Sequence, residues 1–258
     1  MILVMDVGNS NIKIGIFEGD KLLNSWRMKT DLAQTADEYG ICVVEMLRHC
    51  GLDPAGMEGC IMASVIPSLN YTLEHMLEFY LGKKPLVAGP GIKTGINIKY
   101  ENPKEVGADR IVNSLAAWRL YGGPCIVIDF GTATTFNVLS GSGEFLGGVI
   151  CPGIKLSTEA LTSRTAKLPK IELAKPASVV GRTTVANMQS GIIYGFVGMV
   201  DYIVKKIKAE TGFSEAKVIA TGGFSELIAA EAGIIDRTDK TLTLTGLRLL
   251  YELNREAH

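Results

Sequence analysis

Two distant stretches of this chain share one pattern, and this repeat constrains the fold more than any other feature. They read LVMDVGNSNIKIGIF and IVIDFGTATTFNVLS, and each is an apolar strand that ends in Asp, followed by an apolar residue, Gly and small polar residues before a second apolar strand. Asp6 and Asp129 are the equivalent positions. A repeat with so long a period predicts two similar domains rather than a solenoid. We expect them at residues 1–118 and 119–258, packed closely around a cleft because no low-complexity linker separates them.

Around the repeats, apolar strand patterns alternate with helical ones, which is typical of an α/β protein. We expect Ser68 to be the N-cap of one helix, because serine is a favoured residue at that position. The glycines at 191, 195 and 198 weaken the pattern of the longest expected helix. The expected strands are residues 2–6, 11–17, 22–28, 60–66, 85–89, 125–131, 134–140, 144–150 and 217–221, and the expected helices are residues 35–49, 68–81, 104–121, 153–164, 183–211, 224–232 and 246–256.

Charge and cysteine content exclude several classes of protein. The formal net charge is −1, so the chain lacks the basic footprint of a nucleic-acid-binding protein. Its apolar runs are shorter than the roughly 18 residues of a membrane helix, and its start does not resemble a signal peptide. The five cysteines form no CxxC pair, which favours reduced thiols over disulfides or zinc. We therefore expect a cytoplasmic protein without a nucleic-acid or membrane partner.

The first Asp-containing turn has the residue types of a phosphate site. Backbone N–H groups in a tight turn can cradle phosphate oxygens, and Gly8 lets the ligand approach the backbone. The Asp6 carboxylate would repel a phosphate unless a cation lay between them, and Mg²⁺ suits that role. Lys13 can add a positive charge. The alternative is a hairpin with an Asx turn, in which Asp6 and Asn9 only hydrogen-bond local backbone. The second copy of the turn favours a site for a nucleoside triphosphate.

A third motif, ATGGFSELI, follows both turns in the chain. A strand leads into Gly222 and Gly223 and then into a helix. Such a glycine pair lets a flat ring or a ribose approach the backbone, although strand, Gly-Gly and helix is also a common connection.

The duplicated Asp-x-Gly hairpins with a late TGG resemble the actin, Hsp70 and sugar-kinase superfamily. That resemblance implies a duplicated actin-like, ribonuclease H-like ATPase fold with a nucleotide cleft. Within the superfamily, four motifs closely resemble type III pantothenate kinases, and they occur in the order typical of that family: DVGNSNIK, GADR, DFGTATTFNV and GGVICPG. The resemblance spans nearly the whole chain.

The resemblance implies a kinase that moves the γ-phosphoryl group of ATP to pantothenate, giving 4′-phosphopantothenate in the first step of coenzyme A biosynthesis. It makes Asp109 the acceptor of the hydroxyl proton. The substrate residues that it implies are Tyr100, Gly107, Ala108, Asp109, Arg110 and Thr184. Simpler roles stay open for four of these positions: Asp109 and Arg110 as a surface ion pair of one helix, Tyr100 as a packing residue, and Thr184 as a helix N-cap.

The resemblance also implies the nucleotide and cation residues. Asp6 would be nearest Mg²⁺, and Asp129 would hold a monovalent cation, potassium or ammonium. A carboxylate alone does not distinguish the two cations, so their assignment rests on the resemblance. The family is homodimeric, and the glycine face at 191–198 suits either a dimer contact or packing within one chain. The ATP-binding residues that the resemblance implies are Asp6, Val7, Gly8, Asn9, Ser10, Asn11, Ile12, Lys13 and Thr132.

Two other functions remain open at this stage. One is a different kinase or a phosphatase of the superfamily, acting on a sugar, acetate or polyphosphate. The other is a non-catalytic regulatory protein, such as a transcriptional accessory factor, with the same fold. The presence of Asp6, Asp109 and Asp129 together favours an enzyme, because a non-catalytic protein has no need of all three.

Overall fold

The computed structural model describes residues 1–255, which pack into two compact units. Unit 1 comprises residues 1–96 and 102–116 together with the chain from Leu242 onward. Unit 2 comprises residues 97–101 and 117–241. These units group residues by their contacts and do not test the predicted domain boundary. The boundary after residue 118 therefore stays a prediction.

Unit 1 is built on a five-stranded mixed sheet in the order β3-β2-β1-β4-β5. Its first three strands form an antiparallel meander, and β4 and β5 add in parallel on the other side of β1. These are the five strands that the sequence predicts for the first half. Their bounds are β1 Ile2–Val7, β2 Asn11–Glu18, β3 Lys21–Lys29, β4 Gly59–Ser64 and β5 Leu86–Ala88.

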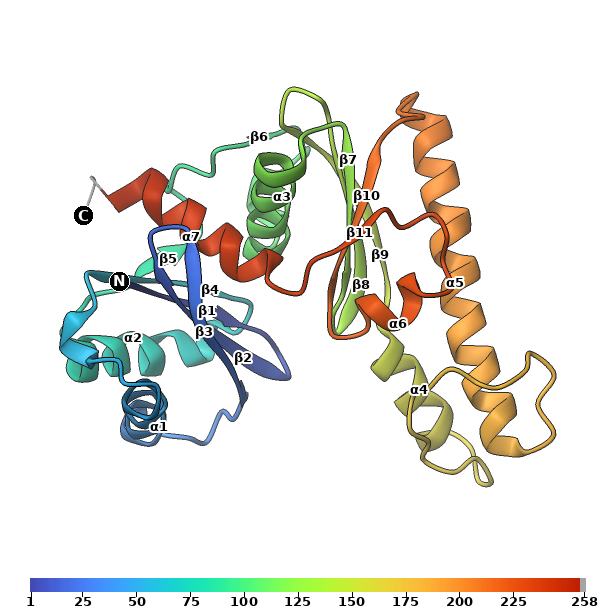
Figure 1. Cartoon of the computed structure of the whole chain (residues 1–258), viewed down its shortest axis with the longest axis horizontal. Coiled ribbons are helices and arrows are strands. Elements are labelled where there is room, and N and C mark those ends of the chain that lie inside the picture. Colours follow the sequence, from blue (N-terminus) through green and yellow to red (C-terminus); the bar gives the residue numbers. More distant parts are fainter. Residues whose placement is uncertain (256–258) are drawn as a thin grey trace. The chain divides into compact units, whose positions relative to one another are not determined.

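Helices cover both faces of the unit 1 sheet. On one face, α1 (Ala36–His49) and α2 (Pro67–Leu81) bury side chains such as Leu47 and Leu73 against the sheet. On the other face, α7 (Leu242–Asn254) and the first part of α3 (Ala108–Tyr121) pack against β1 and β4 (Figure 1). Two 3₁₀ turns, η1 (Pro54–Gly56) and η2 (Pro103–Glu105), complete the elements of this unit.

Several predicted helix starts were wrong. Ser68 does not cap α2: the N-cap is Ile66, which makes no side-chain cap bond, and Pro67 is the first helical residue. Proline suits that position because its φ is already helical and it has no N–H to satisfy. The helix expected from residue 104 begins at Ala108, after η2, and the last helix begins at Leu242 rather than residue 246.

Unit 2 repeats the topology of unit 1. Its sheet has the order β11-β10-β7-β8-β9-β6, so the five strands from β9 to β11 match β3 to β5 in order and direction. The additional strand, β6, pairs in parallel with β9. The bounds are β6 Asn97–Ile98, β7 Cys125–Phe130, β8 Ala133–Leu139, β9 Glu144–Pro152, β10 Lys217–Gly222 and β11 Arg237–Thr238. The sequence did not predict the two-residue strands β6 and β11, which are too short to show an alternating pattern.

One face of the unit 2 sheet is covered by α4 (Ile154–Ser163), α5 (Thr184–Thr211) and α6 (Ser225–Ala229) (Figure 1). The prediction of one long helix over 183–211 is confirmed. Its three glycines are exposed, while apolar residues such as Ile193 and Val200 form the buried side. α6 is shorter than the predicted helix at 224–232. No helix within residues 1–255 is both long and apolar enough to cross a membrane.

Candidate functional site

The first acidic turn joins β1 to β2 in unit 1. The strand register sets Asp6 opposite Lys13, and the Lys13 Nζ lies 3.2 Å from the Asp6 Oδ2. The Gly8 N–H donates to the Asn11 carbonyl oxygen at 3.0 Å and closes the turn. Asn9 and Ser10 are exposed at its tip. The turn therefore presents a half-buried ion pair below a tip of small polar residues.

Asp109 lies in the first turn of α3, in the same unit. Burial raises the pKa of its carboxyl group, and the negative charge of Asp6 raises it further, while the backbone N–H of Arg110 and the Arg110 charge oppose the rise. The influence of Asp6 means that the two carboxylates share one electrostatic environment. An aspartate of raised pKa is a stronger proton acceptor once it is ionised.

The GADR segment is shaped around this carboxylate. A Cβ on Gly107 would lie 2.5 Å from the Asp109 Oδ1, so a larger residue there would displace that carboxylate oxygen from its place. The Gly107 carbonyl accepts the N–H of Arg110 at 3.0 Å and starts the helix. Arg110 is 7% exposed. The surface ion pair considered from the sequence is therefore wrong, because the arginine is buried.

The second acidic turn, in unit 2, is one residue shorter than the first. Residues 131–133 separate the paired Phe130 and Thr134, whereas residues 8–11 separate Val7 and Ile12. The strand register sets Asp129 opposite Thr135, a neutral residue, where Asp6 faces a lysine. The two copies thus differ in charge, which the shared sequence pattern does not reveal.

The TGG motif supports Asp129 directly. Gly222 has a φ of +93°, a region that favours glycine, and a Cβ there would lie 2.6 Å from both the Asp129 Oδ1 and the Phe130 carbonyl oxygen. Gly223 has open space where its Cβ would be. The sequence suggested a platform for a ring or ribose, and the structure adds a role that the sequence missed: Gly222 lets β10 approach the carboxylate.

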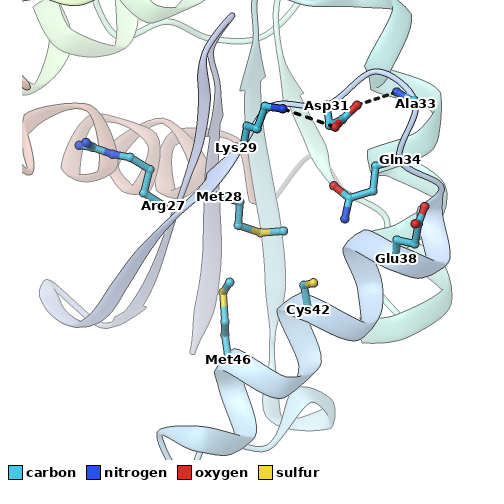
Figure 2. A pocket seen from close by; sticks show the side chains of 9 residues that line it. All are labelled: Arg27, Met28, Lys29, Asp31, Ala33, Gln34, Glu38, Cys42 and Met46. Atoms are coloured by element: carbon cyan, nitrogen blue, oxygen red, sulfur yellow. Dashed lines mark hydrogen bonds and ion pairs between the residues drawn. The ribbon is translucent and has the colours of Figure 1, made fainter.

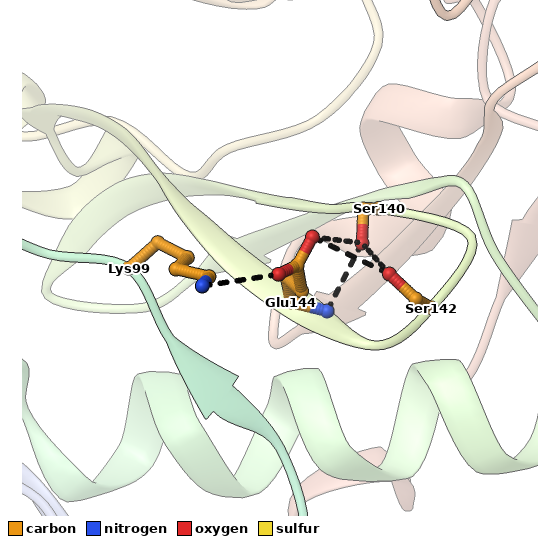
Figure 3. A network of polar contacts seen from close by, with 4 residues as sticks. All are labelled: Lys99, Ser140, Ser142 and Glu144. Atoms are coloured by element: carbon orange, nitrogen blue, oxygen red, sulfur yellow. Dashed lines mark hydrogen bonds and ion pairs between the residues drawn. The ribbon is translucent and has the colours of Figure 1, made fainter.

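Tyr100 follows β6 and packs against β9. Its ring centroid lies 6.2 Å from that of Phe145, and the Lys99 N–H donates to the Phe145 carbonyl at 2.9 Å. Figure 3 shows a neighbouring ion pair that links the segment after β6 to the first residue of β9: the Lys99 Nζ lies 3.3 Å from the Glu144 Oε1. The other carboxylate oxygen of Glu144 accepts bonds from the hydroxyls of Ser140 and Ser142. Tyr100 therefore packs against Phe145, and its role in substrate binding stays a prediction.

Thr184 is not the N-cap of α5. The cap is Thr183, whose hydroxyl oxygen accepts the N–H of Ala186 at 3.2 Å. Thr184 is the first helical residue and is exposed. Its hydroxyl therefore lies beside the N–H groups at the positive end of the helix dipole, where an anion is favoured.

The oxygen donors present suit hard cations. No group of three or more His, Cys, Asp or Glu side chains within residues 1–255 forms a metal cluster. Mg²⁺ does not need one, because it commonly takes one or two carboxylates plus phosphates and water. Asp6 lies near the end of β1, and its assignment to Mg²⁺ stays a prediction. The Asp129 carboxylate is a hard oxygen donor of the kind that a monovalent cation takes, and its assignment to that cation stays a prediction.

A separate groove lies between β3 and α1, and no predicted site residue lines it. Figure 2 shows its polar side, where the Lys29 Nζ lies 3.8 Å from the Asp31 Oδ2 and the Ala33 N–H donates to the Asp31 Oδ1. The groove has a volume of about 520 Å³ and is lined by Arg27, Met28, Lys29, Asp31, Ala33, Gln34, Glu38, Cys42 and Met46.

Comparison with known proteins gives the family of this chain. The model of the type III pantothenate kinase family matches residues 2–206. A Campylobacter jejuni structure, described as a candidate transcriptional activator of the Baf family, is 18% identical, with a TM-score of 0.61 over 98% of this chain and 99% of that one. Component A of (R)-2-hydroxyglutaryl-CoA dehydratase from Acidaminococcus fermentans is 13% identical, with a TM-score of 0.54 over 100% and 99%. The polyphosphate/ATP-glucomannokinase of an Arthrobacter strain is 16% identical, with a TM-score of 0.53 over 100% and 99%.

At identities this low, similarity to the solved structures supports the fold of this chain but not its function. Together with the matching strand orders of the two units, they confirm the predicted α/β class and its duplicated actin-like fold.

Proposed function

Because the chain belongs to the type III pantothenate kinase family, we propose that it transfers the γ-phosphoryl group of ATP to the primary hydroxyl of pantothenate. The product is 4′-phosphopantothenate, the first intermediate of coenzyme A biosynthesis. The observation that carries this proposal is the position of Asp109: a largely buried carboxylate of raised pKa, influenced by Asp6 of a phosphate-type turn in the same unit.

In this mechanism Asp109 accepts the proton of the pantothenate hydroxyl while that oxygen forms a bond to the γ-phosphorus and the bond to ADP breaks. Lys13 and the N–H groups of the first turn bind phosphate oxygens. When bound beside Asp6, Mg²⁺ would supply positive charge to the phosphates. The same proposal gives Asp129 the monovalent cation and Thr132 a phosphate contact.

Pantothenate carries a carboxylate and hydroxyl groups, and the proposed substrate residues can bind both. Arg110 offers a planar fork of donors, and Thr184 a hydroxyl beside helical N–H groups. Gly107 and Ala108 place backbone groups next to Asp109, and Tyr100 offers an aromatic face.

A coupled assay for ADP tests the function. Purified protein with Mg·ATP is expected to turn over with pantothenate, and more slowly without K⁺ or NH₄⁺. Glucose, acetate and polyphosphate serve as alternative substrates. Turnover with one of these and none with pantothenate would replace the proposal by another kinase activity, and absence of all turnover would favour a regulatory protein.

Replacement of Asp129 by Ala is expected to abolish the dependence of the rate on K⁺, because the carboxylate that would hold the cation is gone. A titration of the rate against K⁺ at constant ionic strength measures this. Asp201→Ala is the matched control, since Asp201 is a unit 2 carboxylate that pairs with Lys205 on the surface of α5. An unchanged K⁺ titration in Asp129→Ala would remove Asp129 from the cation site.

Replacement of Thr184 by Val is expected to raise the KM for pantothenate about tenfold, which corresponds to the loss of one hydrogen bond to a charged group, and to leave the KM for ATP nearly unchanged. Thr183→Val is the control, because it removes the helix cap and should lower the melting temperature without this selectivity. A larger change in the KM for ATP would place Thr184 outside the pantothenate site.

We also propose that the protein is a homodimer, as the family resemblance implies. In the part of the chain that the structure describes, no atom outside the neighbouring residues and backbone of α5 lies within 4 Å of a Cβ built on Gly191, Gly195 or Gly198. Packing within one chain therefore does not explain this exposed glycine face, which leaves a second copy as the better explanation. Analytical ultracentrifugation measures the state directly.

A further inference from the structure

Thr30 contacts the first acidic turn through both of its hydrogen-bond donors. It directly follows β3, and its hydroxyl donates to the Gly8 carbonyl oxygen at 2.6 Å. Its backbone N–H donates to the Ser10 carbonyl oxygen at 3.2 Å. No motif in the sequence singles out Thr30, because its partners lie some twenty residues earlier in the chain.

These two bonds determine where the turn points its own donors. In a trans peptide unit, the carbonyl and the N–H point in opposite directions. Because Thr30 holds the Gly8 carbonyl, the N–H of the same peptide unit, which belongs to Asn9, points away from Thr30. The Ser10 carbonyl and the Asn11 N–H are related in the same way. Thr30 thus fixes the direction of the Asn9 N–H at the tip of the turn, one of the N–H groups that the proposed function assigns to phosphate binding.

Thr30 is itself held in place by the core of unit 1. The Asp31 N–H donates to the Tyr39 hydroxyl oxygen at 3.0 Å, and that hydroxyl donates back to the Asp31 carbonyl at 2.9 Å. Tyr39 lies on α1 and is only 1% exposed. On its other side, Thr30 is joined to β3, whose Lys29 pairs with Asn11. The chain Tyr39, Asp31, Thr30 therefore connects the turn to a buried side chain of α1.

Unit 2 has a support at the equivalent position. Gly153 follows the β9 residue that pairs with Ala133, as Thr30 follows the β3 residue that pairs with Asn11. Gly153 has no room for a Cβ, because the Thr132 carbonyl oxygen occupies that place. In both units the residue after the third strand contacts the acidic turn, by hydrogen bonds in one and by close packing in the other.

We propose that Thr30 is a positioning residue for nucleotide binding: it holds the first turn in the conformation that presents N–H groups to the phosphates. The inference rests on one part of the proposed function, that ATP is the ligand. It does not depend on which molecule accepts the phosphoryl group. Phosphate binding by the turn requires pre-oriented donors, so loss of the Thr30 hydroxyl should weaken ATP binding rather than pantothenate binding.

Calorimetric titration of the full-length protein with Mg·ATP, without pantothenate, tests the proposal. Thr30→Val keeps the shape of the side chain but removes the hydroxyl, and we expect about tenfold weaker ATP binding, as for one hydrogen bond of about 1.4 kcal/mol. Thr30→Ser restores the hydroxyl and should bind within about twofold of the wild type on the same basis. Thr94→Val is the control, since the Thr94 hydroxyl also donates to a carbonyl of unit 1, that of Ile96.

Tyr39→Phe provides a second test through the same connection. It keeps the buried ring but frees Asp31, and should weaken ATP binding less than Thr30→Val does. In steady-state kinetics, Thr30→Val should raise the KM for ATP and leave the KM for pantothenate unchanged, a split that a general loss of stability would not give.

Each outcome either supports or overturns the proposed role of Thr30. That role is overturned if Thr30→Val binds ATP as the wild type does, if Thr30→Ser is as weak as Thr30→Val, or if the melting temperature falls while ATP affinity does not. If Thr30→Val does not fold, Thr30→Ala replaces it, and failure of both to fold would make Thr30 a determinant of folding instead. A wild type that binds ATP but ignores pantothenate contradicts the proposed function alone, and one that binds no ATP contradicts both.

Discussion

Asp109→Asn is expected to lower kcat by about 10²- to 10⁴-fold, the usual contribution of a general base. Asparagine has nearly the same shape as aspartate and can still accept the backbone N–H of Arg110 that bonds the native carboxylate. It cannot accept the hydroxyl proton. ATP binding, measured by calorimetry, should stay close to that of the wild type, so the loss would appear in the chemical step.

The same variant is expected to be more stable than the wild type at neutral pH. Burial raises the pKa of Asp109 in the folded protein above its ordinary value. The folded state therefore binds this proton more tightly than the unfolded state does, and stability falls as the pH rises from the ordinary pKa through the raised one. Above that window the wild type contains a buried charge, which asparagine removes. Thermal melts at pH 7 should show a higher melting temperature.

These two results together separate catalysis from folding. A merely structural Asp109 would give a variant that melts earlier and loses activity for that reason. Retention of turnover within a few-fold of the wild type would remove Asp109 from the role of base. Asp37→Asn is a suitable control, because Asp37 is a carboxylate of the first turn of α1 in the same unit.

Much of the fold could be predicted because its signals are local. The repeated strand, Asp, Gly and strand pattern predicted the two hairpins, and the structure shows that the matching continues through the whole strand order of both sheets. The long helix α5 was predicted despite its glycines, since the apolar residues between them share one buried side. The errors lie at helix ends such as that of α2, where Pro67 replaced the expected side-chain cap.

The relations within the site were harder to predict, because they depend on residues far apart in the chain. The sequence contains Asp6 and Asp109, but not the fact that one carboxylate raises the pKa of the other. It contains the TGG motif, but the contact of Gly222 with the Asp129 carboxylate depends on the pairing of β10 with β7. Thr30 has no motif around it, and only the register of β2 and β3 places it beside the first turn.

Asp6→Asn is expected to have the second large effect, a loss of about 10²-fold or more in kcat/KM for ATP, because charge stabilisation by a bound metal ion is worth several kcal/mol. The variant removes the carboxylate that would hold Mg²⁺. It also removes the partner of Lys13, whose Nζ lies 3.2 Å from the Asp6 Oδ2. Weaker dependence of the rate on Mg²⁺ concentration would accompany the loss. Asp20→Asn, at an exposed carboxylate in the turn between β2 and β3, is the control.

The pH dependence of Asp6→Asn tests whether the two carboxylates are coupled. A base works only when it is ionised, so the rate rises with pH through the pKa of Asp109, and the raised pKa moves this acidic limb above the range of an ordinary aspartate. Removal of the Asp6 charge eliminates one of the two causes that raise the pKa. The limb should therefore move to lower pH, though not to the ordinary value, because burial remains. A ¹³C NMR titration of the Asp109 carboxyl in the ligand-free protein measures the same shift without activity, and an unchanged pKa would show that the two carboxylates act independently.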